Sequence, residues 1–220
     1  MTIRSRTPVS MSDGSNAGEW LSTHPREAMD WFSSLTVPWW VAGGWALDLH
    51  IGTQSRPHGD LDIGVLRRDF LVLAHVLASW EIFEAKDGIL TRLPDGALPR
   101  VDVNSLWCRR KQAKSWVLEV MLDDSAGEDW VFRRRPEIRR PLVEVVRRDA
   151  RGIPYLAPET QLLYKARHQR ERDQGDFDRV QPHLDEKARQ WLHDALVRSE
   201  PGHVWIAALS STRLNAVHPF

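Results

Sequence analysis

Alternation of apolar and polar residues is clearest in the segment from Asp60 to Val65. Leu61, Ile63 and Val65 would lie on one face of a strand and Asp60 and Asp62 on the other, because successive side chains point to opposite faces. The pattern predicts a strand with one face packed in a core and the other presenting two carboxylates.

The residues before this strand predict a helix, a strand and a second helix. Thr23 is the expected N-cap of the first helix, with a proline in its first turn. The apolar run 38–42 predicts a short buried strand that stops at Gly43-Gly44. Trp45–Ile51 is expected to form a short helix closed by Gly52.

The residues after it predict mostly strands. One apolar helix is expected over 70–80 and a strand with a turn within 81–93. Two further strands, 101–107 and 116–122, are joined by the basic loop 108–115. Shorter β-like stretches follow at 131–133 and 142–146.

Helical periodicity takes over at Pro158, with helices expected over 158–169, 173–182, 185–199 and 202–210. The polar, aperiodic residues 1–19 are expected to be a flexible N-terminal arm. The chain is therefore expected to have an α+β domain over 20–157 and a helical C-terminal region over 158–220.

The composition of the chain excludes several classes of protein. The 220 residues contain 42% hydrophobic residues, which excludes a disordered chain, and 30 basic residues balance 30 acidic ones. A net charge of zero argues against a general binder of nucleic acid. The single cysteine excludes a disulfide framework. We expect no secretory signal, and no apolar run is long enough for a membrane helix, so we expect a cytoplasmic protein with no membrane partner.

Two features suggest phosphate chemistry. Asp60 and Asp62 would lie on one strand face about 7 Å apart at Cα, where their like charges repel unless a cation lies between them. Mg²⁺ prefers such oxygen ligands. Gly43 and Gly44 separate a strand from a helix, where backbone N–H groups can approach a phosphate closely.

The continuous stretch 40–65 carries a specific motif. It resembles the nucleotidyltransferase superfamily that includes DNA polymerase beta, and most closely its aminoglycoside 2″-adenylyltransferases and lincosamide nucleotidyltransferases. Those proteins carry the pattern G-G-W-x-x-D-x-x-x-G-x-x-[TS]-R-x-H-x-D-[LI]-D. The matching residues are Gly43, Gly44, Trp45, Asp48, Gly52, Ser55, Arg56, His58, Asp60 and Asp62.

The resemblance implies a polymerase-beta-like mixed sheet with flanking helices, followed by a helical region. It implies that the two glycines hold the phosphates of ATP or another NTP, and that Asp60 and Asp62 hold two Mg²⁺ ions. It also implies a third carboxylate that acts as base toward the acceptor. Glu119, in the middle of a predicted strand, is preferred, and Asp123 and Asp102 remain open.

The resemblance also implies nucleotide-binding roles for Arg56, His58 and Lys165. The acidic segment 119–130 would suit a cationic acceptor, bound by Asp123 and Asp124. Eight arginines within 133–151 could instead contact RNA, although a solvated face is the simpler interpretation.

These observations together indicate a Mg²⁺-dependent nucleotidyltransferase. It is expected to move a nucleoside monophosphate, AMP from ATP, to a hydroxyl of a small molecule such as an aminoglycoside- or lincosamide-like antibiotic. One alternative is a toxin-like transferase that modifies tRNA or a protein. The other is a catalytically silent nucleotide-binding regulatory protein.

Overall fold

A mixed β-sheet forms the centre of the protein. The structure is a computed structural model that describes residues 8–10, 18–167 and 170–211. Its strands lie in the order β1-β5-β4-β6-β7-β3-β2-β11-β10, and β8 and β9 extend from β7. β3 runs parallel to β7, and β11 runs parallel to β2, whereas the other paired strands are antiparallel. The expected α+β class with a mixed sheet is confirmed.

The strands are β1 (Pro8–Ser10), β2 (Trp39–Val41), β3 (Asp62–Leu66), β4 (Trp80–Lys86), β5 (Ile89–Arg92), β6 (Ser105–Arg110), β7 (Leu118–Ala126), β8 (Asp129–Val131), β9 (Arg139–Pro141), β10 (Val146–Arg148) and β11 (Pro154–Leu156). The α-helices are α1 (Pro25–Trp31), α2 (Gly43–Ile51), α3 (Phe70–Val76), α4 (Leu142–Val145), α5 (Pro158–Ala166), α6 (Glu171–Val180), α7 (Glu186–Ser199) and α8 (Val204–Ser211). Short 3₁₀ turns, η1 (Arg67–Asp69) and η2 (Gln181–His183), precede α3 and follow α6.

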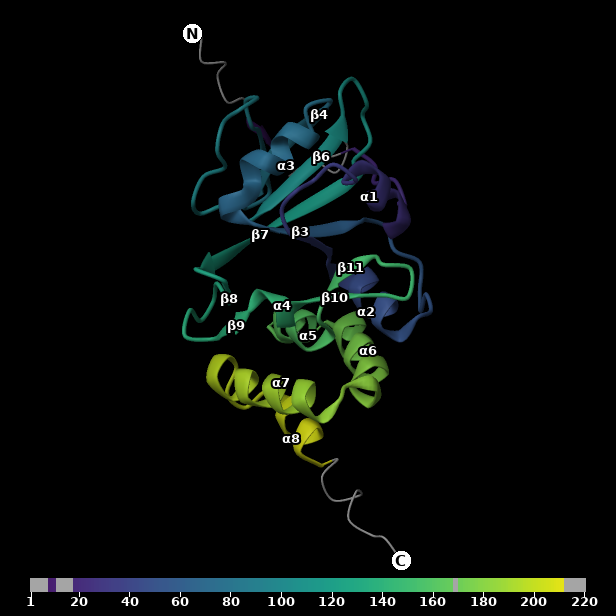
Figure 1. Ribbon diagram of the computed structural model, residues 1–220, viewed down its shortest axis with the longest axis vertical. Coiled ribbons are helices and arrows are strands. Elements are labelled where there is room, and N and C mark those ends of the chain that lie inside the picture. The colour runs from purple at the N-terminus through teal and green to yellow at the C-terminus, as the bar shows by residue number, and fades with distance from the viewer. Residues whose placement is uncertain (1–7, 11–17, 168–169, 212–220) are drawn as a thin grey trace, which may run out of the picture.

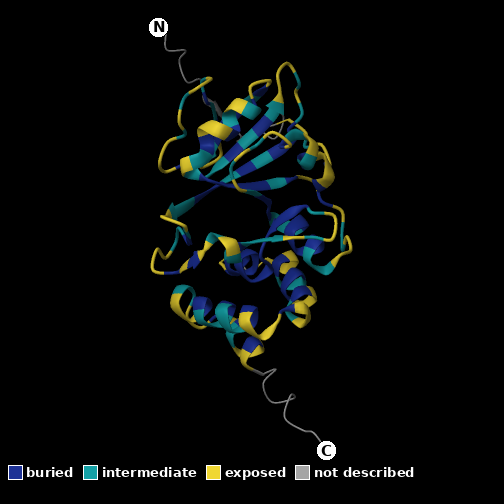
Figure 2. Cartoon of the chain, in the orientation of Figure 1, coloured by how far each residue is buried: buried dark blue, intermediate teal, exposed yellow. Residues whose placement is uncertain are grey.

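The helices gather at the two ends of the molecule. In Figure 1, α1 and α3 lie beside β4 and β6, whereas α2 and α4 to α8 gather with β10 and β11 at the other end. Figure 2 shows α2 and α5 as the most deeply buried helices. One cluster of buried apolar residues runs from Ala28 through the strands to Leu209, so α5 and α7 share the core of the sheet.

Several expected boundaries are corrected. His24, not Thr23, caps α1, because its ring accepts from the backbone N–H of Arg26 while Glu27 bonds back to the His24 N–H. Helix α2 begins two residues early, at Gly43. The expected helix 70–80 ends at Val76, and a turn leads into β4 at Trp80.

Two expected strands also differ. Residues 101–104 form a turn with Val101 88% exposed, and β6 begins only at Ser105. The stretch 142–146 begins as the helical turn α4, in which Val143 is 84% exposed. Val103 and Val145 are buried, whereas Val101 and Val143 face solvent, so burial does not follow the pattern that predicted two continuous strands.

The first residues that the structure describes form one short strand. Most of the expected arm 1–19 lies outside the described residues, although Pro8–Ser10 pairs with β5. Within the described part of the chain, every helix is too short or too polar to cross a membrane.

Candidate active site

Three carboxylates meet at the centre of the sheet. Asp62 and Glu119 are register partners in the parallel pair β3–β7, and the Glu119 N–H donates to the carbonyl of Leu61 at 2.9 Å. Asp60 lies two residues before the start of β3 at Asp62. One carboxylate oxygen from each of Asp60, Asp62 and Glu119 lies within 4.8 Å of the others. The structure thus brings together the two motif aspartates and the preferred third carboxylate.

Burial and mutual repulsion raise the free energy of the three ionised carboxylates when no cation is bound. Burial, followed by the charges of Glu119 and Asp60, raises the pKa of Asp62 well above its usual value. Burial also raises the pKa of Glu119, against a hydrogen bond of 2.6 Å donated by the Ser105 hydroxyl. A hard divalent cation would relieve both effects, and an all-oxygen set of ligands is what Mg²⁺ prefers. The residues therefore fit the metal that the fold implies.

The Gly43–Gly44 turn lies directly against this cluster. Gly43 has φ +65°, and a Cβ there would overlap the Asp62 carboxylate. A Cβ on Gly44 would lie 2.5 Å from Cε1 of His58 and 2.6 Å from the guanidinium of Arg56. Both positions need glycine because other side chains pack closely against them. At Gly44 those side chains are His58 and Arg56.

Helix α2 begins at this turn without a side-chain cap. Its N-cap residue, Ala42, has no side-chain acceptor, and the Gly43 N–H donates to Oε1 of Gln161 at 2.8 Å. The start of α2 therefore lies at the wall of the cavity with its first N–H bonded to Gln161, and a helix N-terminus at such a place favours a bound phosphate.

His58 is held rigidly behind the turn. Its Nε2 lies 2.6 Å from Oδ2 of Asp48, and its ring packs on Trp45 with centroids 4.4 Å apart. Arg56 lies 3.7 Å from Asp176 of α6. The motif aspartate Asp48 thus orients His58 and also accepts from the backbone N–H of Ser55.

Lys165 reaches the same cavity from α5 and is only 8% exposed. Its Nζ lies 3.1 Å from Asp173 and 2.9 Å from Asp176. Since the charge of Lys165 also acts on Asp62, this lysine links the carboxylates of α6 with the central cluster.

A cavity of about 590 Å³ joins these groups. Its wall includes the three carboxylates, both glycines, Arg56, His58 and Lys165, so the residues expected to bind metal and nucleotide all face one space. Trp40, Gln161 and Tyr164 also line it.

The remaining acidic candidates lie elsewhere or are bonded within the protein. Asp123 lines the cavity, but it is 5% exposed and accepts a 2.6 Å hydrogen bond from the Tyr164 hydroxyl. Asp124 is outside the wall and lies 3.2 Å from Nε of Arg67. Asp102 is an exposed partner of Lys86. The segment 119–130 is therefore not one continuous acidic surface.

The arginine-rich segment is likewise dispersed. Arg140 is 4% exposed and lies 2.6 Å from the buried Glu159, which also contacts Arg147. Arg133 and Arg134 instead line the cavity. The stripe that favoured an RNA-modifying enzyme is not a single face in the structure.

Sequence reasoning missed four residues of the site. Gln161 lies one helical turn before Lys165, so the spacing of four could have indicated it. Trp40 lies in the expected buried strand 38–42, and neither Trp40 nor Tyr164 was singled out for the site. Ser105, the donor to Glu119, lies in a strand whose start was placed too early.

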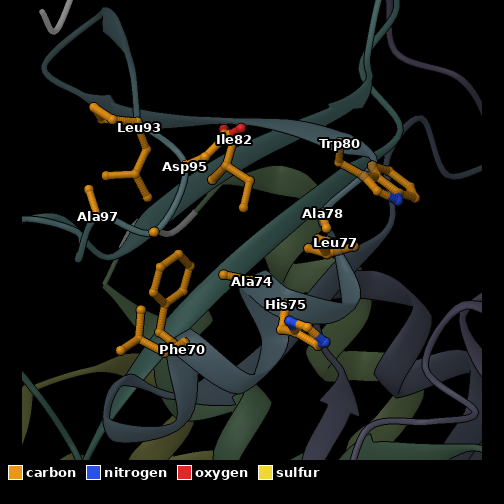
Figure 3. Close-up of a pocket in the computed structure, with 13 residues that line it drawn as sticks. Phe70, Ala74, His75, Leu77, Ala78, Trp80, Ile82, Leu93, Asp95 and Ala97 are labelled. Carbon is orange, nitrogen blue, oxygen red and sulfur yellow. The ribbon is translucent and has the colours of Figure 1, made fainter. Parts of the chain in front are cut away.

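A second cavity of about 280 Å³ lies between α3 and the segment 93–97 (Figure 3). Its wall is mostly apolar, with Phe70, Leu77 and Trp80 among the lining residues. Asp95, at its rim, pairs with Arg92 and Lys111. This cavity lacks the carboxylates and donors that the larger one assembles.

Three solved structures are similar to this one. A lincosamide antibiotic adenylyltransferase, LnuA, with lincomycin bound, has a TM-score of 0.52 at 18% identity, covering 76% of this chain and all (100%) of its own. ANT(2″)-Ia in complex with adenylyl-2″-tobramycin has a TM-score of 0.47 at 16% identity, covering 86% of this chain and 95% of its own. An antigenic nucleotidyltransferase-like protein from Paracoccidioides brasiliensis has 0.44 at 19% identity, covering 93% and 95%.

The likeness to LnuA confirms the expected nucleotidyltransferase fold. No curated protein matches the chain in sequence. The family model of the aminoglycoside-2″-adenylyltransferases matches residues 26–180, which is more than two thirds of the chain and includes the cluster, the glycine turn and Lys165. The chain therefore belongs to the aminoglycoside-2″-adenylyltransferase family, and it is an adenylyltransferase.

Proposed function

We propose that this enzyme transfers AMP from ATP to a hydroxyl group of a small, antibiotic-like acceptor. The observation that carries the proposal is the triad Asp60, Asp62 and Glu119, with oxygens within 4.8 Å, which lines one cavity together with the Gly43–Gly44 turn at the start of α2. Enzymes that transfer nucleotides need a metal site and a phosphate site side by side.

The three carboxylates would hold divalent metal, two Mg²⁺ ions in the form we propose. When bound, Mg²⁺ neutralises charge on the phosphates and on the leaving group. The support for these ligands is their mutual distance, their burial and the raised pKa values of Asp62 and Glu119.

The nucleotide is proposed to lie along Gly43 and Gly44. The N–H groups of the first α2 turn would donate to phosphate oxygens, and Arg56, His58 and Lys165 surround the same space. Asp48 and Trp45 hold the His58 ring still, which lowers the entropic cost of positioning the phosphates.

Glu119 is proposed to accept the proton of the acceptor hydroxyl. The hydroxyl oxygen then attacks the α-phosphorus in line, and the bond from that phosphorus to the bridging oxygen breaks. Pyrophosphate leaves with the electron pair, and AMP stays on the acceptor. Ser105 holds Glu119 in place through its 2.6 Å hydrogen bond.

The test is incubation with ATP and Mg²⁺ against separate acceptors, followed by mass spectrometry. Lincomycin, which is bound in LnuA, and tobramycin, chosen because the matching family is that of the aminoglycoside adenylyltransferases, are the first acceptors to try. Total tRNA is the third. We expect one adenylyl group on a small molecule and a matching release of pyrophosphate. Labelling of tRNA alone would move the function to the toxin-like alternative.

The alternative of a catalytically silent nucleotide-binding protein differs from the proposed enzyme in its lack of turnover. It would bind ATP and Mg²⁺ in calorimetry yet release no pyrophosphate with any of the acceptors, whereas the proposed enzyme does both.

A further inference from the structure

The cavity wall carries more positive than negative side chains. Four carboxylates line it, of which three form the metal cluster. Six cationic residues line it as well, namely Arg56, Arg133, Arg134, Lys165, Arg170 and Arg172. A metal bound at the cluster would offset its charge, and the cationic residues that have no carboxylate partner would then decide which charge the rest of the wall favours in an acceptor.

Five of the six cationic residues fall into two groups by their partners, and the sixth, Arg172, is exposed. Arg56, Lys165 and Arg170 pair with the α6 carboxylates Asp173 and Asp176. Arg133 and Arg134 have no carboxylate within 4.0 Å among residues 8–10, 18–167 and 170–211. Both are only partly exposed. Their charge is therefore available to a ligand.

These two arginines lie at the Asp123 end of the cavity. Arg133 lies close enough to Asp123 and Tyr164 to influence the pKa of both. Asp123 is four residues beyond Glu119 on β7, about 13 Å along the strand. The arginine pair is thus displaced from the glycine turn, which touches Asp62 at the level of Glu119.

Arg134 is held in a fixed position. Its guanidinium donates to the Tyr164 carbonyl at 3.1 Å and lies 5.7 Å from the Tyr164 ring centroid and 5.8 Å from that of Phe132. Burial and the like charges of Arg167 and Arg133 lower its pKa. A fixed guanidinium beside a second one is a preorganised anion site, because little side-chain entropy is lost on binding.

A buried donor without a partner among the described residues lines the same cavity. Trp40 is fully buried, lines the cavity, and its Nε1 has no hydrogen-bond partner among the described residues. Its indole covers Gly64, the residue of β3 that follows Asp62 on the same face. An unpaired buried N–H costs free energy until a ligand supplies an acceptor atom.

We infer that the acceptor carries an anionic group, a phosphate or a carboxylate, bound by Arg133 and Arg134 with Trp40 donating to an oxygen of the same molecule. The inference rests on the proposed function, since it concerns the acceptor of that reaction. The one carboxylate near the pair, Asp123, is already bonded to Tyr164. A polyamine sugar would meet guanidinium groups there, so of the acceptors tried under the proposed function tobramycin is expected to bind more weakly than an anionic molecule.

The test separates this anion site from the triphosphate site. Wild-type enzyme is saturated with Mg²⁺ and a non-hydrolysable ATP analogue, then titrated calorimetrically with inorganic phosphate, glucose 6-phosphate, glucosamine and tobramycin. We expect both phosphates to bind beside the analogue and the two amines to bind at least tenfold more weakly than glucose 6-phosphate. Arg133→Gln should weaken phosphate binding at least tenfold, and Trp40→Phe at least threefold.

Arg139→Gln is the matched control, because Arg139 lies on the neighbouring strand β9, is exposed, and is outside the cavity wall. It should bind phosphate as the wild type does. The unfolding temperatures of all variants show that they are folded. The variant Arg133→Lys keeps the positive charge and should therefore retain part of the affinity for phosphate.

Three outcomes overturn the inference. The first is equal binding of glucose 6-phosphate and glucosamine. The second is no effect of Arg133→Gln. The third is loss of analogue binding in Arg133→Gln, which would assign the pair to the triphosphate. If the analogue fails to bind even the wild type, the proposed function fails instead, and the phosphate titrations of the metal-free protein still decide the anion site.

Discussion

Asp62 and Glu119 are register partners on the parallel strands β3 and β7, so the backbone of the sheet itself sets the distance between their carboxylates. Both strands are central, with β2 on one side and β6 on the other. Two such carboxylates cannot move apart to relieve their repulsion, and this fixed repulsion is what makes the pair a strong site for a divalent cation.

Asp62→Asn is expected to abolish the stabilisation by Mg²⁺ and to reduce turnover at least 100-fold. The amide relieves the repulsion, so the metal-free variant should melt at or above the temperature of the wild type. Thermal unfolding with and without Mg²⁺, beside an assay of pyrophosphate release, measures both effects.

Asp102→Asn is the control for that prediction, because Asp102 is exposed and paired with Lys86, away from the cluster. It should retain the Mg²⁺ response and full turnover. Near-wild-type activity of Asp62→Asn at saturating Mg²⁺ would disprove the proposed metal site.

Gly43→Ala and Gly52→Ala form a matched pair at the two ends of α2. Both glycines have positive φ, +65° and +87°, but only at Gly43 would a Cβ meet the Asp62 carboxylate, whereas Gly52 has open space. We expect Gly52→Ala to lower the free energy of unfolding by about 1 kcal/mol and to keep activity. Gly43→Ala should lower it further and lose the Mg²⁺-induced rise in melting temperature. Equal behaviour of the two variants would show that backbone strain alone matters at Gly43.

Lys165→Met tests whether this lysine serves the fold, the nucleotide or both. It leaves buried Asp173 and Asp176 short of a partner, so we expect a loss of about 3 kcal/mol in the free energy of unfolding. Adding Asp176→Asn should restore part of that stability. The nucleotide KM should stay at least tenfold raised in both variants. A KM that recovers together with stability would leave Lys165 a structural role only.

The central part of the site could be predicted from the sequence because its residues are close together in the chain. Strand, glycine turn, helix and two-carboxylate strand lie within 40–65, and local pattern was enough to order them. The family resemblance implied a third carboxylate, and Glu119 could be preferred because it lies in the middle of its predicted strand. The direct pairing of Glu119 with Asp62 could not be predicted, since the register between distant strands depends on packing across the whole sheet.

The cationic wall could not be predicted, for a related reason. Arg133, Arg140 and Arg147 are near one another in sequence, yet one faces the cavity and the others bind the buried Glu159. The division at residue 157 stays a prediction. Helix α5 does begin at Pro158, while the buried core continues through it.

The raised pKa of Asp123 predicts how the stability of the protein changes with pH. Burial raises its pKa to about 6 from 3.8, against the hydrogen bond from Tyr164. The folded protein therefore binds a proton that the unfolded chain has lost between pH 4 and 6, and this residue makes the wild type less stable as pH rises through that window. The amide in Asp123→Asn would still accept from Tyr164 but would not titrate. We expect the stability of this variant relative to wild type to improve between pH 4 and 7, by at most about 3 kcal/mol.

Urea unfolding at pH 4, 5, 6 and 7 measures that difference, and Asp102→Asn gives a comparison of opposite sign. The hydrogen bond from Lys86 lowers the pKa of Asp102, so the folded protein holds that carboxylate ionised more readily than the unfolded chain. Its contribution is present above the unfolded pKa and is lost as pH falls, so Asp102→Asn should become relatively less stable as pH rises. If Asp123→Asn instead becomes less stable relative to the wild type as pH rises, as Asp102→Asn should, the pKa of Asp123 is not raised in the folded protein.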